Sequence, residues 1–252
     1  MGRNSKTGAV TWVSGLVLTG MVGSLALLPG VAHADMVYNT SLAPPGVYFG
    51  SGNANSNFTV DDSNGVELGL SGIIRYSVGG PITPVGSPQN IYDAPIGATT
   101  SVGHTGSKWG FDFSIDVNSS GSTGLALADV TASLTLTDVK QSTTGSFNPL
   151  TIGDNATVGA SAAQNSEALS YASIAGALGD PGFNLNAYDT YDFTLTVTCT
   201  NADACGSNLG DVLASDSMSV QTVPEPASLA LLAFGLAGLG FVRYRNKATG
   251  TI

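Results

Sequence analysis

The two cysteines are the residues whose type and spacing first suggest chemistry. Cys199 and Cys205 enclose a short polar stretch in CTNADAC, directly after an alternating apolar run. In an exported chain this spacing favours a disulfide that closes a small ring and rigidifies the loop. Free thiols are the first alternative. A metal or redox role comes last, because a metal site needs about four ligands and no further ligand stands at a suitable spacing. We predict a disulfide, no metal site and no cofactor.

Candidate catalytic residues are few. His104 is the one histidine beyond the predicted leader, and it lies in the loop sequence SVGHTGSK with no nucleophile motif beside it. The chain lacks a G-x-S-x-G turn, paired histidine ligands and a glycine-rich phosphate loop. Asp112 and Asp116 share one face of a predicted strand but lie about 13 Å apart, too far to act on one bond. We therefore predict no catalytic residue, and a solvated sheet face for these two aspartates.

The acidic stretch VDDSNGVE, residues 60–67, has oxygen-bearing side chains at alternating positions, as in a calcium loop. An EF-hand loop places a bidentate glutamate at its twelfth position, where this chain has Gly72. Asn64-Gly65 is instead a strong hairpin signal. We predict a turn here and keep an incidental calcium site as the alternative.

Strict alternation of apolar and polar residues defines the elements that position these side chains. In WGFDFSIDV, Trp109 and every second residue after it are apolar, so we expect Trp109 in the core. Such alternation marks strands with one buried and one wet face, as in antiparallel sheets that pack as a sandwich. Residues 167–178, EALSYASIAGAL, are ambiguous between a strand and a short helix, and we favour a strand. The other expected strands are residues 66–78, 130–138, 191–199 and 215–221 and a segment around Phe58.

The composition of residues 35–222 limits the partners of this all-β domain. The segment holds every one of the 18 acidic residues except Glu225, but only Arg75, Lys108 and Lys140 of the 8 basic residues. Binding to phosphate needs clustered Lys and Arg, so a surface with this excess of acid repels nucleic acid and anionic lipid alike. The length suits one domain with a real core, and no internal repeat or second boundary is apparent.

The N-terminus has the pattern of a signal peptide. Arg3 and Lys6 precede an apolar run, Pro29-Gly30 interrupts it, and Ala32 and Ala34 supply the small residues that signal peptidase accepts before Asp35. The alternative is an uncleaved membrane anchor, since the apolar run is long enough to span a bilayer. We predict cleavage after Ala34, with residues 1–34 as a helical leader.

The C-terminus has a second pattern that is typical of a targeting signal. Val223, Pro224, Glu225 and Pro226 precede the uncharged, Leu/Ala/Gly-rich stretch Ala227–Val242, and basic residues follow it. We predict a single transmembrane helix, slightly shorter than usual, whose basic end stays in the cytoplasm. A plain tail anchor is the simplest alternative. The three basic residues are Arg243, Arg245 and Lys247.

The stretch VPEPASLALLAFGLAGLGFVRYRNK resembles the PEP-CTERM sorting signal of Gram-negative bacteria. It keeps the Pro-Glu-Pro motif, the short apolar helix and the Arg-rich end in order over about 25 residues. The resemblance implies recognition and cleavage near the motif by exosortase, a membrane-embedded transpeptidase-like enzyme, in an organism that makes exopolysaccharide. The resulting organisation is a signal peptide (1–34), an exported acidic β-sandwich (35–222), a sorting and anchor segment (223–247) and a tail (248–252).

Two hypotheses remain for the sandwich. The first is a non-enzymatic surface or matrix protein, associated with exopolysaccharide or biofilm. The second is an exported carbohydrate-binding module or hydrolase, in which Tyr48, Tyr92 or Trp109 would stack on sugar rings. We favour the first, because the alternation places Trp109 in the core and catalytic motifs are missing.

Overall fold

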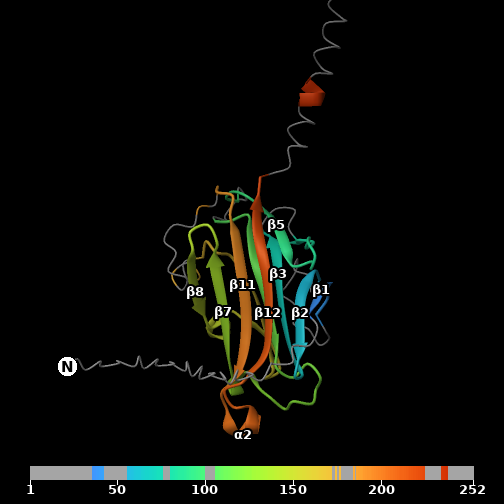
Figure 1. Ribbon diagram of the computed structural model, residues 1–252, viewed down its shortest axis with the longest axis vertical. Coiled ribbons are helices and arrows are strands. Elements are labelled where there is room, and N and C mark those ends of the chain that lie inside the picture. Colours follow the sequence, from blue (N-terminus) through green and yellow to red (C-terminus); the bar gives the residue numbers. More distant parts are fainter. Residues whose placement is uncertain are drawn as a thin grey trace, which may run out of the picture. The chain divides into compact units, whose positions relative to one another are not determined.

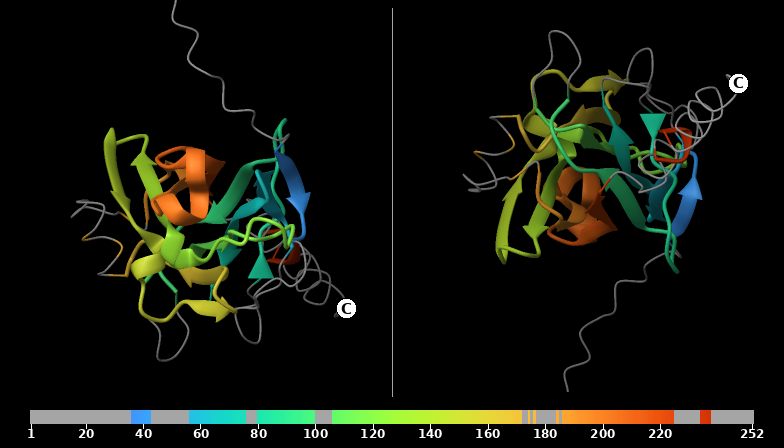
Figure 2. Two further views of the ribbon diagram at one scale, coloured as in Figure 1. Left: turned by 90° about the horizontal axis from the view of Figure 1, so that it is seen from below. Right: turned by 90° about the horizontal axis from the view of Figure 1, so that it is seen from above.

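Two β-sheets packed face to face form the part of the chain that the structure, a computed structural model, describes (Figure 1). All neighbouring strands are antiparallel except β5 and β12, which run parallel. The predicted all-β class is therefore confirmed in its coarse form, and a sandwich is the natural description of two mostly antiparallel layers (Figure 2). The described residues are 36–42, 56–75, 80–99, 106–171, 174, 176, 184, 186–224 and 234–237.

Seven strands form sheet A. Their order is β1-β2-β3-β6-β10-β9, and β4 pairs with the end of β3. The central strands follow from the long alternating sequences, and Asn64 and Gly65, both at positive φ, make the predicted turn between β2 and β3. The strands are β1 (Val37–Thr40), β2 (Phe58–Ser63), β3 (Val66–Ile74), β4 (Gly80–Pro81), β6 (Trp109–Asp116), β9 (Ala156–Val158) and β10 (Ala162–Glu167).

Five strands form sheet B, in the order β5-β12-β11-β7-β8. Its last strand in sequence, β12, lies between β5 and β11 and is the longest element of the sheet. The strands are β5 (Ile91–Pro95), β7 (Val130–Asp138), β8 (Thr143–Phe147), β11 (Thr190–Cys199) and β12 (Val212–Val223). The short helices η1 (Leu127–Asp129) and η2 (Pro149–Thr151) lie in connections between the two sheets, and α2 (Ala202–Cys205) and η3 (Gly206–Asn208) lie between β11 and β12.

The core lies between the two sheets and is centred on β6 and β11. Phe111 of β6 packs on Phe193 of β11 with ring centroids 4.9 Å apart, and Trp109 packs on Tyr191 at 5.4 Å. Trp109 is only 2% exposed, which confirms its predicted place in the core. Pairs of rings at this spacing contribute about 0.5–1.5 kcal/mol beyond the area that they bury.

The prediction that Asp112 lies on a solvated sheet face was wrong, because the outer face of sheet A is buried at this position. Asp112 was expected to face water, but it is 1% exposed, and its partner Ser71 on β3 and Ser114, two residues further along β6, are also buried. Alternation reports that the two faces of a strand differ in polarity. It does not report whether the polar face is covered. Only sheet B has the expected solvated outer face, for example at Asp192 and Thr194.

The prediction of a strand over residues 167–178 was wrong for the described residues after Glu167, and residues 172, 173, 175, 177 and 178 lie outside the described part of the chain. Glu167 ends β10, and Ile174 and Gly176 are helical. The apolar positions here do not repeat with period two, and the ladder with β6 ends at Glu167 and Phe111. The strand prediction for residues 66–78 holds as far as Ile74, and residues 76–79 lie outside the described part of the chain.

Candidate functional site

The C-terminal end of β12 is the point where the folded body meets the predicted sorting motif. Val223 is the last residue of the strand, and the exposed Pro224 follows it (Figure 1). Proline has no backbone N–H and cannot continue the hydrogen-bonded ladder. The sequence therefore ends the strand at the first residue of Pro-Glu-Pro.

Hydrogen bonds hold the strand in place up to that point. The backbone N–H of Ile96 donates to the Val223 carbonyl oxygen at 3.2 Å, and the N–H of Thr222 donates to Asp189 O at 2.9 Å. The Asp189 N–H donates back to the buried Thr222 hydroxyl at 2.7 Å. Burial raises the pKa of the Asp189 carboxyl, against a lowering by the Thr190 N–H that it accepts. The body thus fixes the polypeptide to within one residue of the motif.

Most of the residues predicted for sorting, membrane anchoring and signal cleavage lie outside the described part of the chain. This applies to Glu225 and Pro226 of the motif, to the basic residues Arg243, Arg245 and Lys247, and to the cleavage residues Ala32, Ala34 and Asp35. Within Ala227–Val242, residues 234–237 are described and helical, and Phe234 is 75% exposed. Among the described residues, none of the helices has the length and apolar character needed to cross a bilayer.

The two cysteines lie at the opposite end of the sandwich, where the structure joins Cys199 to Cys205 by a disulfide. Their Cα atoms are 6.3 Å apart, and α2 occupies the ring between them. Asn201 caps α2 by accepting from the Asp203 N–H, and its amide donates to Asp129 Oδ1 at 2.6 Å. Hydrogen bonds from the Ala126 N–H and from Asn201 lower the pKa of Asp129. This arrangement ties the loop to the start of β7.

A pair of buried aspartic acid side chains, Asp61 and Asp216, joins β2 to β12, and sequence reasoning missed it. Asp61 Oδ2 accepts the Ser215 N–H at 2.7 Å and Asp61 Oδ1 accepts the Ser63 hydroxyl at 2.6 Å. Asp216 and Asp61 are both fully buried. We call this contact the β2–β12 seam; it consists of Thr59, Asp61, Ser63, Ser215 and Asp216. The sequence does contain an indication that Asp216 is buried. Asp216 alternates with the apolar Ala214, Met218 and Val220 and so lies on the apolar face of the strand.

Hydrogen-bond counting assigns a proton to Asp216 in this seam. The Thr59 hydroxyl lies 3.2 Å from Leu70 O and 3.0 Å from Asp216 Oδ2, but it has only one proton to donate. Both contacts are satisfied when Thr59 donates to Leu70 O and the protonated Asp216 donates to Thr59. Burial, together with the nearby Asp61 charge, raises the pKa of Asp216 well above its ordinary value, which favours this form.

A second buried polar cluster lies where β3, β6 and β10 end near one another. Arg75 donates to Ser166 Oγ and to Tyr171 Oη, each at 2.8 Å, and its guanidinium stacks 5.2 Å from the Tyr171 ring centroid. Burial raises the pKa of Asp112 to about 7, although Ser166 and Arg75 oppose the change. Burial and the Asp154 charge likewise raise the pKa of Glu167 to about 7. These carboxyls are closed off from water, so we interpret them as structural groups.

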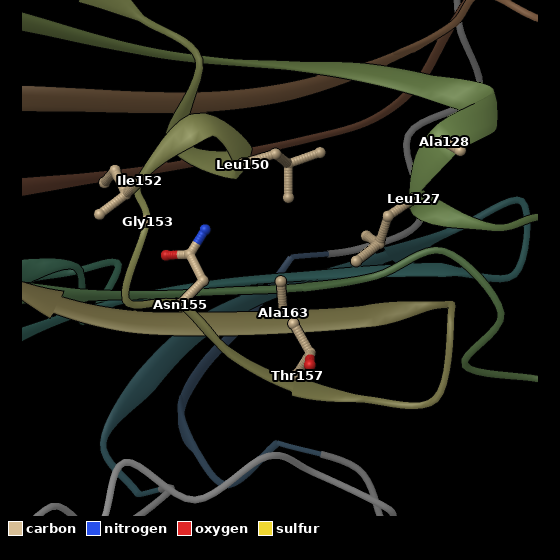
Figure 3. A pocket seen from close by; sticks show the side chains of 8 residues that line it. All are labelled: Leu127, Ala128, Leu150, Ile152, Gly153, Asn155, Thr157 and Ala163. Carbon is tan, nitrogen blue, oxygen red and sulfur yellow. The ribbon is translucent and has the colours of Figure 1, made fainter.

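A pocket of about 400 Å³ opens between β9–β10 and the short helices η1 and η2. Leu127 and Leu150 point toward each other across it, above Ala163 of β10 (Figure 3). Asn155 is the main polar group in the wall, but its amide donates to Pro149 O at 2.9 Å and its oxygen accepts from Asn165. With these groups already paired, the pocket presents mainly aliphatic surface.

The two described aromatic residues of the predicted sugar-stacking set, Trp109 and Tyr92, do not form an exposed stacking surface. Trp109 and Tyr92 are buried, and the Tyr92 hydroxyl donates to Asn57 O at 2.7 Å. Tyr48 and His104 lie outside the described residues. Within the described ranges, no three His, Cys, Asp or Glu side chains converge in a way that would hold a metal ion. The strongest functional feature of the described chain is therefore the β12 terminus.

Comparison with known proteins agrees with this location. The family model described as PEP-CTERM protein-sorting motif matches residues 222–245, which begin at Thr222 and extend through the apolar stretch to Arg245. None of the curated proteins matches the chain. The family-model match thus concerns the C-terminal segment and does not extend over the sheets. The chain carries a PEP-CTERM sorting signal, and this signal marks it as an exported protein that is targeted to exosortase.

Proposed function

We propose that this chain is a non-enzymatic cell-surface or extracellular-matrix protein, cut from a membrane-held precursor by exosortase and associated with exopolysaccharide. The observation that carries the proposal is the direct passage from β12 into the sorting motif. A cut near Pro224-Glu225-Pro226 releases the complete sandwich, because the final ladder contact of sheet B is at Val223. Before the cut, Ala227–Val242 holds the precursor in the membrane.

The N-terminal end of the domain supports the same proposal of export and processing. The first described strand, β1, begins at Val37, directly after the proposed signal-peptidase cut between Ala34 and Asp35. Pairing of β1 with β2 at the edge of sheet A therefore needs no residue of the leader. Both proposed cuts leave the sheets whole.

The solvated face of sheet B suits a hydrated polysaccharide environment. Hydroxyl side chains from three neighbouring strands stand in rows on this face, and Asp192 is the one carboxylate among them. Ser219 donates to Asp192 at 2.6 Å, and Thr137 and Thr144 share a 2.9 Å hydrogen bond. The hydroxyl residues are Thr131, Ser133, Thr135 and Thr137 of β7, Thr194, Thr196 and Thr198 of β11, and Ser215, Ser217 and Ser219 of β12.

The alternative of a carbohydrate-binding module or hydrolase keeps the same sorting signal. Burial of Trp109 and Tyr92 argues against both as sugar-stacking residues. The buried carboxyls of Asp112 and Asp216 also lack the open cleft in which a pair of acids acts on a glycosidic bond. These observations favour the matrix role.

Intact mass of the protein recovered from the producing cells tests the proposal. We expect a species that begins at Asp35 and ends near Val223, with any added mass identifying the attached group. Replacing Pro224, Glu225 and Pro226 with alanine should abolish this species. The matched control, Thr249→Ala with Thr251→Ala beyond the motif, should leave processing unchanged. Recovery of every form with its C-terminus intact through Ile252 would show a simple membrane anchor instead.

A further inference from the structure

The last residues of β12 have hydrogen-bonding neighbours on both sides. Strand β5 pairs with Ser219–Val223 on one side, and β11 pairs with β12 as far as Gln221 on the other (Figure 1). Beyond Gln221, the Thr222 N–H donates to Asp189 O at 2.9 Å. The main chain of β12 is therefore engaged up to Val223, directly before Pro-Glu-Pro.

The side chain of Thr222 fastens the same end of the strand. Its hydroxyl accepts the Asp189 N–H at 2.7 Å and donates to Ala187 O at 3.0 Å. Thr222 is only 3% exposed. Pulling this residue out of the sheet would leave its partners without hydrogen bonds, which carries a free-energy cost. The body thus holds the residue at which the sorting-motif match begins.

An enzyme that cuts a peptide bond binds the residues before that bond in an extended form. Extended peptides are recognised through main-chain hydrogen bonds, and the nucleophile has to approach the carbonyl carbon to about 3–3.5 Å. The main chain of β12 already pairs with β5 and β11, so it cannot pair with an enzyme unless it leaves the sheet. We therefore expect the folded sandwich to prevent cleavage at every bond of β12.

Proline prevents cleavage at two of the bonds beyond the strand. In Val223–Pro224 and Glu225–Pro226, the nitrogen belongs to a pyrrolidine ring and carries no hydrogen. The ring crowds the bond, and the nitrogen cannot donate a hydrogen bond to the enzyme. Pro224–Glu225 and Pro226–Ala227 are the bonds of this segment that have an ordinary N–H.

Distance from the sheet decides between these two bonds. The Pro224 carbonyl lies one residue beyond Val223, or about 3.3–3.6 Å along the chain, which is less than the roughly 4.7–4.9 Å between neighbouring strands. An enzyme strand beside Pro224 would therefore collide with the neighbours of β12. The Pro226 carbonyl lies three residues beyond Val223 and can be up to about 10 Å from the sheet, which leaves room for such a strand.

We infer that exosortase cuts the bond between Pro226 and Ala227, and that the sandwich sets this position by holding β12 up to Val223. This inference rests on the proposed function, because it requires a membrane-held precursor that is processed. On the other side of the bond, Ala227–Val242 lies in the bilayer in that proposal. The amides of a membrane-spanning helix are hydrogen-bonded to one another and are not open to attack.

The reaction leaves Pro226 as the new C-terminal residue of the domain. The enzyme's nucleophile adds to the Pro226 carbonyl carbon, and the bond from that carbon to the Ala227 nitrogen breaks. A proton from the enzyme goes to this nitrogen, which leaves as the amine of the membrane-held stretch. Water, or an acceptor with an amine or hydroxyl group, then takes the acyl group, loses a proton to the enzyme and restores the nucleophile.

Mass spectrometry of the C-terminal peptide, on protein recovered from the producing cells, tests the assignment. We expect a product that ends at Pro226. Ala227→Pro turns the scissile bond into one with a proline nitrogen, and this product should be lost. Ser228→Pro is the matched variant, because it makes the same change one bond later and should leave the product in place. The reverse result would place the cut between Ala227 and Ser228 and overturn the inference.

Two changes of spacing test the part that the sheet plays. Inserting Gly-Ser-Gly between Val223 and Pro224 moves the motif away from the sheet, so the cut should stay after Pro226 and the processed fraction should not fall. Deleting Val223 draws Pro224 into the last position of the ladder and leaves two free residues before the bond. The processed fraction should then fall. Equal processing of the two variants would show that the sheet does not set the position.

The identity of the C-terminus separates this inference from the proposed function. An unaltered protein that keeps its C-terminus through Ile252 would refute both the processing and the assigned bond. A processed product that ends at Val223 or Pro224 would leave the proposed function standing and refute the inference alone, because the enzyme would then have drawn β12 out of the sheet.

Discussion

Burial of Asp112 predicts that the processed protein is more stable in mild acid than in mild base. Burial raises the pKa of this carboxyl from the ordinary 3.8 to about 7, despite hydrogen bonding from Ser166 and the charge of Arg75. The folded protein therefore holds this proton more tightly than the unfolded chain does. Stability from such a group is fully present below pH 3.8 and is lost as the pH rises through about 7.

The size of the effect follows from the two pKa values. One pKa unit is worth about 1.4 kcal/mol, so raising the pH from 5 to 8 should cost about 2–3 kcal/mol of unfolding free energy through Asp112. Glu167 acts in the same direction, because burial also raises its pKa to about 7. Replacing Asp112 by asparagine removes the titrating group while preserving its shape, and should remove its share of the pH difference.

Urea unfolding at the two pH values, followed by Trp109 fluorescence, measures the effect. The unaltered protein should have the higher midpoint at pH 5, and Asp112→Asn should narrow the gap chiefly by raising stability at pH 8. Asp116→Asn is the matched control on the same strand and face, where the carboxylate is partly exposed to water. A gap of unchanged size in Asp112→Asn, or greater stability of the unaltered protein at pH 8, would refute the reasoning.

Three further changes test other parts of the sandwich. Asp61→Ala leaves the buried Ser215 N–H without its acceptor and should lower the unfolding free energy in urea by about 1–3 kcal/mol. Asp62→Ala, at the neighbouring exposed residue, should lower it by less than about 0.5 kcal/mol. Equal losses would contradict a stabilising role of the β2–β12 seam. Gly110→Ala would force a Cβ into the Glu167 carbonyl oxygen and should destabilise by at least about 1–3 kcal/mol, whereas Gly153→Ala has open space and should be nearly neutral in thermal unfolding. Cys199→Ser with Cys205→Ser should lower stability by about 2 kcal/mol, as expected for a short ring, and an unchanged melting temperature in oxidising buffer would show that the bond contributes nothing.

Sequence periodicity predicted β2, β3, β6, β7, β11 and β12, but it missed the shorter strands β1, β4, β5, β8, β9 and β10 and could not predict what covers the polar faces. The alternation in β6, β7 and β11 identified Trp109, Phe193 and Leu195 as core residues, because only one face of each strand is apolar. The same pattern predicted that Asp112 faces water. It cannot show whether other segments of the chain cover the polar face of the strand. Burial of that face depends on neighbours that are remote in sequence.

The parts of the candidate site that sequence reasoning missed also depend on distant pairing. Asp61 and Ser215 are far apart in the chain, and their contact follows from the packing of β2 beside β12. The sorting motif was recognisable from sequence because it is a contiguous segment that is read in the order of its residues.

The position of β12 also has a consequence for the order of events during secretion. This strand is the last part of the domain to leave the translocation channel, yet it lies between β5 and β11 and closes the middle of sheet B. Strands β5 and β11 therefore cannot pair with β12 until it has been translocated, and the hydrophobic layer between the sheets stays incomplete until then. Because Pro224 follows Val223 directly, completion of the fold and emergence of the sorting signal are nearly simultaneous. The enzyme that cuts this chain thus receives a substrate whose domain has only just become able to finish folding.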